Sequence, residues 1–184
     1  MKIEFVSGSQ YFLLFIDGYS HFNWVYFLKY KSETFENFKK FKAFADNQSG
    51  KKLKALCTGK GDEFLSNKYI AFCDENKIHR ELTIPYTPKQ NGVAEWKNRT
   101  MEEMAKSLFK AQSLPNYFWG EAIAIAIYLL NISLTKAALN KTPFEGWRGK
   151  KPQVRHLKIF GCIAYGLVNI HSKPDEKSQK IHFH

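Results

Sequence analysis

The chain has little cysteine, few acidic residues and no long apolar run, and each shortage excludes a class of protein. Its three cysteines, Cys57, Cys73 and Cys162, form no C-x-x-C pair, so we expect neither a disulfide scaffold nor a zinc ribbon, and a reducing compartment is the default. The longest apolar run, residues 122–130, is about half of the roughly 20 residues that span a bilayer. Residues 1–10 also lack the apolar stretch of a signal peptide. We therefore expect a soluble, intracellular chain with no membrane partner.

The shortage of acids leaves the chain strongly basic. Seventeen Asp and Glu face 28 Lys and Arg, which gives a formal net charge of +11. Such a balance favours a polyanionic partner, with nucleic acid ahead of an acidic membrane surface. The 16 Phe, nine Tyr and four Trp among 184 residues exceed what a disordered chain carries, so we expect a packed core.

The pattern of apolar residues predicts an α/β fold. Residues 11–16 and 24–28 are short aromatic and β-branched runs, which predict an antiparallel β-hairpin. The further elements that we expect are a helix from Ser32, as its N-cap, to Gly50, a strand at 53–58, a helix at about 66–76, a strand at 78–84, an irregular loop at 85–88, helices at 92–112 and 115–132, a short helix within 141–152, a last strand within 156–168 and a loose polar tail at 172–184. The apolar run in residues 119–130 also fits a strand, but its length and alanine content favour a helix. This order predicts a mixed sheet flanked by helices.

Four acidic residues lie where two-metal phosphoryl transfer would need them, near strand ends and at a helix start. They are Asp17, Asp62, Glu63 and Glu95. Carboxylates of this kind hold two divalent ions about 4 Å apart on either side of a phosphodiester. Each also has a structural interpretation, because acids favour turns and the first turns of helices.

The segment PYTPKQNGVAEWKNRTM, residues 85–101, resembles the PYTPQQNGVAERKNRT-like segment of copia-type long-terminal-repeat retrotransposon integrases, which are part of a retrovirus-related Pol polyprotein. Further similar stretches are YFLLFIDGYSHFNWVYFLKYKSETFENFKKF, LPNYFWGEAIAIAIYLLN, KTPFEGWRGKKP and HLKIFGCIAY, so the resemblance covers nearly the whole chain. It implies an RNase H-like fold, with a catalytic core at residues 1–132 and a downstream region of the polyprotein at 133–184. It also implies DDE strand transfer with Mg²⁺ or Mn²⁺, DNA ends and target DNA as substrates, and action in the nucleus.

The catalytic acids of that family do not all carry over. Its glutamate falls on Glu95, but its second aspartate, in an SDNGGEF-like motif, falls on Gly59, and the 35 residues between the two positions match the usual spacing of the family. Its first aspartate lies in a DLCGPM-like stretch, and this chain begins at about that methionine. Asp17 matches a neighbouring acid that is not a metal ligand. Asp62 lies three residues beyond Gly59, past the turn, so we do not expect it to replace the missing ligand. We therefore expect weak metal binding at Glu95 and no catalysis.

The residues expected to contact DNA lie at the start of the long helix. They are Lys89, Gln90, Asn91, Lys97, Asn98 and Arg99, and we expect Lys97 and Arg99 to begin an exposed face that meets phosphates without sequence preference. A second basic cluster, Lys150, Lys151, Arg155, His156 and Lys158, is either a further contact or a solvated turn.

Two other functions stay open at this point. In one, Asp62 together with Glu4 or Asp17 supplies the missing acids of an active polynucleotidyl transferase. In the other, the chain is an interaction module, or a homo-oligomer, that associates through an exposed apolar face of the helix at 119–130. The fold itself raises one question, which is whether residues 1–7, with the strand-compatible Ile3, Phe5 and Val6, replace the first strand of the family.

Overall fold

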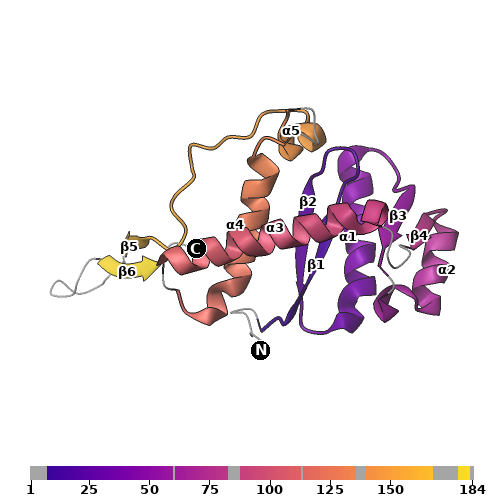
Figure 1. Cartoon of the computed structure of the whole chain (residues 1–184), viewed down its shortest axis with the longest axis horizontal. Coiled ribbons are helices and arrows are strands. Elements are labelled where there is room, and N and C mark those ends of the chain that lie inside the picture. The colour runs from indigo at the N-terminus through magenta and orange to yellow at the C-terminus, as the bar shows by residue number, and fades with distance from the viewer. Residues whose placement is uncertain are drawn as a thin grey trace.

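The computed structural model (Figure 1) describes residues 8–59, 61–82, 88–112, 114–135, 140–167 and 178–182. At residues 88–91, 93, 112, 163–167 and 178–182 it describes the backbone alone. The possible first strand at residues 1–7 and most of the expected loop at 85–88 lie outside the described residues. Among the helices that are described, none is long and apolar enough to cross a membrane.

The predicted β-hairpin is confirmed, and it forms the centre of the fold. Strand β1 (Tyr11–Ile16) pairs antiparallel with β2 (Asn23–Leu28), so that Tyr11 lies opposite Leu28 and Ile16 opposite Asn23. Because side chains alternate along a strand, Leu13 and Phe15 pack on one face, while Phe12 and Leu14 pack on the other. The hairpin is therefore covered on both sides.

Helix α1 (Thr34–Ser49) covers the first face. It ends at Gly50, whose φ of 65° is the left-handed conformation that glycine adopts readily at a helix end. Phe38 is fully buried, and the ring of Phe41 stacks on that of Phe15 at a centroid distance of 4.0 Å. The expected N-cap at Ser32 is wrong, because a 3-10 turn, η1 (Lys31–Glu33), includes Ser32 and leads directly into the helix.

A parallel pair of short strands follows α1. Strand β3 (Ala55–Thr58) pairs with β4 (His79–Leu82), and between them lie a 3-10 turn, η2 (Asp62–Phe64), and α2 (Asn67–Glu75), whose N-cap is Ser66. Strand β3 is two residues shorter than the sequence predicted, β4 begins one residue later than predicted, and residues 83–84 of that predicted strand lie outside the described residues. The strands of the described residues are hydrogen-bonded in pairs, and β3 pairs with β4 rather than with the hairpin. The fold is α/β, as predicted. Among the described residues the strands form two-stranded sheets, of which β3–β4 is parallel, while β1–β2 and the pair of β5 (Ile163–Leu167) and β6 (Ser178–His182) are antiparallel.

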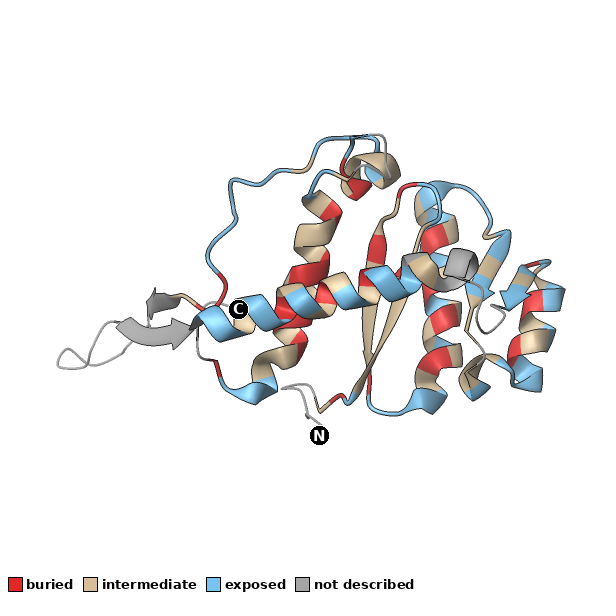
Figure 2. Ribbon diagram, in the orientation of Figure 1, coloured by how far each residue is buried: buried red, intermediate tan, exposed pale blue. Residues whose placement is uncertain are grey.

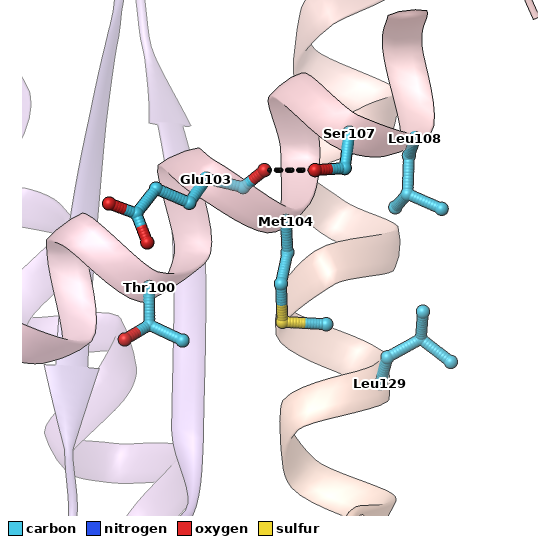
Figure 3. Close-up of a pocket in the computed structure, with 6 residues that line it drawn as sticks. All are labelled: Thr100, Glu103, Met104, Ser107, Leu108 and Leu129. Atoms are coloured by element: carbon cyan, nitrogen blue, oxygen red, sulfur yellow. Dashed lines mark hydrogen bonds between the residues drawn. The ribbon is translucent and has the colours of Figure 1, made fainter. Parts of the chain in front are cut away.

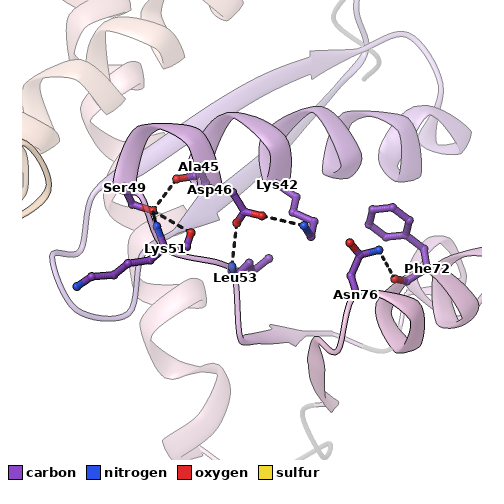
Figure 4. Close-up of polar contacts among 8 residues, drawn as sticks. All are labelled: Lys42, Ala45, Asp46, Ser49, Lys51, Leu53, Phe72 and Asn76. Carbon is purple, nitrogen blue, oxygen red and sulfur yellow. Dashed lines mark hydrogen bonds and ion pairs between the residues drawn. The ribbon is translucent and has the colours of Figure 1, made fainter.

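Asp46 fixes where β3 begins (Figure 4). Its carboxylate accepts hydrogen bonds from Lys42 Nζ at 2.8 Å and from the backbone N–H of Leu53 at 2.8 Å. Burial acts to raise the pKa of this carboxyl, but the hydrogen bonds from Lys42 and Leu53 and the charges of Lys42 and Lys52 hold it below its usual value. This contact ties the end of α1 to the chain that leads into β3.

Two long helices cover the other face of the hairpin. Helix α3 (Pro88–Gln112) crosses α4 (Trp119–Ile132), which is preceded by a 3-10 turn, η3 (Asn116–Phe118). The helical interpretation of residues 119–130 is confirmed. The core between these helices and the hairpin is built from residues of both, including the fully buried Met101 and Ile123. Figure 2 shows the buried residues of α4 and the exposed stripe of α3.

The last part of the chain packs back onto the hairpin. Helix α5 (Pro143–Arg148) starts with a capping box, in which the Thr142 hydroxyl accepts from Glu145 N and the Glu145 carboxylate accepts from Thr142 N. Gly146 lies against the hairpin loop, where an added Cβ would come within 2.8 Å of Ser20 Cβ. Trp147 meets Trp24 edge to face at 4.8 Å.

A final hairpin corrects the expectation of a loose tail. Strand β5 (Ile163–Leu167) pairs antiparallel with β6 (Ser178–His182), and Ile163 lies opposite His182. Residues 178–182 are thus a strand. The polar sequence SQKIH gives little sign of it, because main-chain pairing rather than an apolar pattern holds it in place.

Candidate active site

A cavity of about 680 Å³ lies between β1 and β3, over α1 and beside the first half of α3. Its wall includes β1 from Tyr11 to Ile16 and the segment from Ala55 to Gly59, and α3 contributes Ala94 and Asn98. The fold therefore brings the end of β3 close to the part of α3 that carries Glu95.

Gly59, which the resemblance aligns with the second aspartate of the family, stands at the wall of this cavity. A Cβ built at Gly59 meets no described atom within 4 Å. The glycine is thus not required by crowding, and a larger side chain would have room. In this chain, however, the position supplies no metal ligand.

Glu95 lies on α3 and is exposed. Its helical neighbours Ala94 and Asn98 line the cavity, whereas Glu95 is not among the lining residues. The carbonyl oxygen Oδ1 of Asn98 is buried, and no described residue donates a hydrogen bond to it. Sequence reasoning chose Asn98 only as a DNA contact, and its position on the cavity wall became visible only in the structure.

Of the other candidate acids, Asp17 and Glu63 line the cavity and Asp62 does not. Asp17 Oδ2 accepts from Ser20 N and Ser20 Oγ, each at 2.7 Å, and from Tyr19 N at 3.2 Å, so this carboxylate closes the hairpin loop. Asp62 is exposed on η2. The Glu63 carboxylate folds over Gly61, where it would lie 2.6 Å from an added Cβ.

These positions leave no metal cluster in the part of the chain that the structure describes. No three His, Cys, Asp or Glu side chains there come together in a way that could hold an ion. Glu4, a further candidate for a substitute acid, lies outside the described residues.

Lys97 corrects the expected DNA-binding face. Its side chain is 4% exposed, and burial lowers its pKa. The reason is helical spacing, because Lys97 precedes the fully buried Met101 by four residues and Ala105 by eight, so all three share the inner face of α3. Arg99, two residues on, is exposed as expected. Lys89, Gln90 and Asn91 lie in the first turn of α3, and their side chains are outside the described part of the structure.

A second depression, of about 310 Å³, lies between α3 and α4 (Figure 3). Its walls are Thr100, Glu103, Met104, Ser107 and Leu108 of α3 and Leu129 of α4. The Ser107 hydroxyl donates to the Glu103 carbonyl at 2.9 Å, within the same helix. The depression is shallow and brings together no set of reactive side chains.

Helix α4 does not offer the surface that the interaction-module hypothesis requires. From Gly120 to Ile132 each residue is buried or half-buried in this structure. Its apolar side chains, Ala122, Ile123, Ala126 and Ile127 among them, form the core with α3.

Comparison with solved structures identifies the fold. The HTLV-2 integrase catalytic core domain, solved in complex with magnesium in a trimeric form, superposes with a TM-score of 0.53 over 73% of this chain and 82% of that one, at 24% identity. A simian T-cell lymphotropic virus intasome, solved in complex with the PP2A regulatory subunit B56 gamma, gives a TM-score of 0.61 over 97% of this chain and 63% of that one, at 16% identity. The fold is thus that of an integrase core, which is RNase H-like.

Comparison of sequences identifies the family, although no family model matches the chain. The chain is 41% identical, over 97% of its length, to the retrovirus-related Pol polyprotein from transposon TNT 1-94 of Nicotiana tabacum. It is 30% identical, over 95% of its length, to that from transposon RE1 of Arabidopsis thaliana. The chain is an integrase-like domain of the copia-type retrovirus-related Pol polyproteins. This integrase-like domain spans only 14% and 12% of those two relatives.

Proposed function

We propose that this integrase-like domain binds DNA but does not catalyse strand transfer. The observation that carries the proposal is Gly59, which lies at the cavity wall in the place of the second catalytic aspartate. Two-ion catalysis needs carboxylates both to bind the ions and to set their spacing. A glycine there removes one ligand without disturbing the fold around it.

The remaining residues do not fit the divalent ion that the family uses. A magnesium ion takes six oxygen ligands in near-octahedral geometry and is held through carboxylates. Around the cavity, Asp17 already accepts three hydrogen bonds from its own loop, and the Glu63 carboxylate lies against Gly61. In the described residues no group of three or more His, Cys, Asp or Glu side chains could hold an ion, so we derive no metal-dependent step.

The support for DNA binding is electrostatic. A formal charge of +11 favours a polyanion at any site that presents cations, and Arg99 presents one on the exposed stripe of α3 beside the cavity. Lys89, Gln90, Asn91 and Asn98 remain predicted contacts, whereas Lys97 would first have to leave the core. Binding of this kind would be non-specific and would act where chromosomal DNA is, in the nucleus.

Catalysis is tested with model DNA ends in Mg²⁺ and in Mn²⁺. We expect neither 3′-end processing nor strand transfer above background. Glu95→Gln is the matched control, because it removes the one retained acid and keeps its shape. Activity of the wild-type chain that disappears in Glu95→Gln would refute the proposed inactivity.

Binding is tested by titrating a labelled duplex over a range of salt concentrations. Log affinity should fall linearly with log salt, with a slope that reports the number of neutralised phosphates. Two unrelated sequences should bind equally. The DNA-binding part of the proposal fails if the chain does not bind at low salt, or if its affinity is insensitive to salt.

A further inference from the structure

A long irregular segment, residues 149–159, crosses the surface between α5 and β5, and we name it the basic strap. It contains neither helix nor strand, and all of residues 153–159 are exposed. Figure 2 shows it as a pale blue stretch along the upper edge of the molecule. Its cations are Lys150, Lys151, Arg155 and Lys158, each exposed.

Three contacts hold the strap, one just before its start, one in its middle and one just after its end. At its start, Trp147 packs on Trp24 and donates its indole N–H to Gln48. In its middle, Nε2 of His156 lies 2.7 Å from the hydroxyl of Tyr128 on α4. At its end, Phe160 is 6% exposed and belongs to the core between α3 and α4. The main chain of an exposed segment is therefore fixed to both cores.

The charge of the strap is uncompensated. No Asp or Glu occurs between Glu145 and Asp175, and no ion pair within 4.0 Å involves a strap cation in the described residues. The acidic group whose pKa a strap cation influences is the Glu145 carboxyl. Its pKa is lowered first by the hydrogen bonds from Thr142 and only to a lesser degree by Lys151. Four of the cations that give the chain its net charge of +11 thus lie within nine residues.

We propose that the basic strap is a contact surface for the phosphate backbone of duplex DNA, separate from the face of α3. The inference rests on the proposed DNA binding and adds a site to it. Long cationic side chains on an anchored main chain suit phosphates, which fix position without reading sequence. Because three anchors already order the main chain, binding has to order only side chains, which lowers its entropic cost.

The test compares two sets of four substitutions in the full chain. The strap set is Lys150→Gln, Lys151→Gln, Arg155→Gln and Lys158→Gln. The control set is Lys40→Gln, Lys51→Gln, Lys54→Gln and Lys68→Gln, which removes the same charge from exposed positions on and around α1 and α2. Affinity for one labelled duplex is measured from low to high salt, and circular dichroism checks that each variant is folded.

At about 0.9 per neutralised phosphate, four contacts would lower the log–log salt slope by about 3.6. We expect a decrease approaching this value for the strap set, with an affinity loss of at least about tenfold at low salt. The pair Lys150→Gln and Lys151→Gln should give about half the decrease, and the control set should give much less than the strap set.

Equal losses in the two sets would show that only net charge matters, and would overturn the inference. Wild-type binding by the strap set would also overturn it, while the proposed DNA binding would stand. If the wild-type chain itself does not bind duplex DNA, the proposed function and the inference both fail.

Discussion

Replacing Asn131 should destabilise the domain more than any exposed substitution, because this side chain joins α4 to the start of β2. Asn131 Oδ1 accepts from Asn23 N at 2.8 Å and from Asn23 Nδ2 at 2.9 Å, and Asn131 Nδ2 donates to Asn23 O at 2.8 Å. Asn23 and Asn131 are 2% and 6% exposed. Water therefore has little access to replace a lost partner.

The magnitude follows from the groups that Asn131→Ala leaves unpaired. The N–H and the C=O of Asn23 both lose their partner, whereas Asn23 Nδ2 keeps its bond to His21 O at 2.9 Å. Each buried unpaired group costs about 1–3 kcal/mol, so the free energy of unfolding should fall by about 4 kcal/mol. This is a large share of the 5–15 kcal/mol that a typical domain has.

Urea denaturation followed by tryptophan fluorescence measures this loss. At an m-value of about 2 kcal/mol/M, a loss of about 4 kcal/mol moves the midpoint down by about 2 M. Asn67→Ala, an exposed asparagine at the start of α2, is the matched control and should change stability by less than about 0.5 kcal/mol.

A second variant separates hydrogen bonding from packing. Asn131→Leu fills the volume but leaves the same two backbone groups unpaired, so it should be nearly as destabilising as Asn131→Ala. The reasoning is refuted if Asn131→Leu restores wild-type stability, or if Asn131→Ala costs less than about 1 kcal/mol.

Three further predictions concern the site and the charged core. Gly59→Asp alone should fold like the wild type, because its Cβ has room. It should leave strand transfer in Mn²⁺ at background, because metal ligands act as a unit. Clear activity would mean that another acid already occupies the position of the first catalytic aspartate. Lys97→Met should raise the melting temperature at neutral pH. Burial lowers the pKa of Lys97 below its ordinary 10.5, so the folded state disfavours the charged form, and the advantage of Met should shrink as pH rises toward 10.5; an advantage that grows with pH would contradict this. Asp46→Asn should destabilise the domain at neutral pH and approach wild-type stability in acid. The pKa of Asp46 is lowered below 3.8 in the fold, so the stability that its carboxylate contributes is lost as pH falls through that lowered pKa. A constant difference between the urea midpoints of the variant and the wild type across pH would refute this.

Much of the fold could be predicted because its signals are local. The aromatic runs of β1 and β2 and the phenylalanine stripe of α1 each show the period of their element within one window of sequence. For the alanine-rich run of α4, length and composition predict a helix rather than a strand. Even the end of α1 at Gly50 follows from a residue type that suits the left-handed conformation.

What sequence could not supply depends on partners far along the chain. The pairing of β5 with β6 crosses residues 168–177 and rests on main-chain bonds, which any side chain allows. The charge of Lys97 predicts an exposed position, although its spacing of four from Met101 places it on the inner face of α3. At this position the residue type predicts exposure and the helical period predicts burial, and the structure confirms burial.

The candidate site divides in the same way. The alignment of Glu95 and Gly59 with family positions rests on motifs that occur in the same order along the chain. Such motifs can be recognised from the sequence alone. Two other features of the site depend on the folded structure. Asn98 lines a cavity with Gly59 because β3 and α3 meet in space, and the Asp17 carboxylate accepts a hydrogen bond from Ser20 in the hairpin loop after β1. No spacing along the chain encodes that meeting.

The contact between Trp24 and Trp147 makes the docking of α5 optically visible. Two indoles 4.8 Å apart and at 84° to each other are close enough for their electronic transitions to couple, which produces a paired circular-dichroism band that neither indole gives alone. The other two tryptophans, Trp96 on α3 and Trp119 on α4, belong to different elements. The coupled band would therefore report, in solution and without a label, whether α5 stays seated on the hairpin when other parts of the domain are changed.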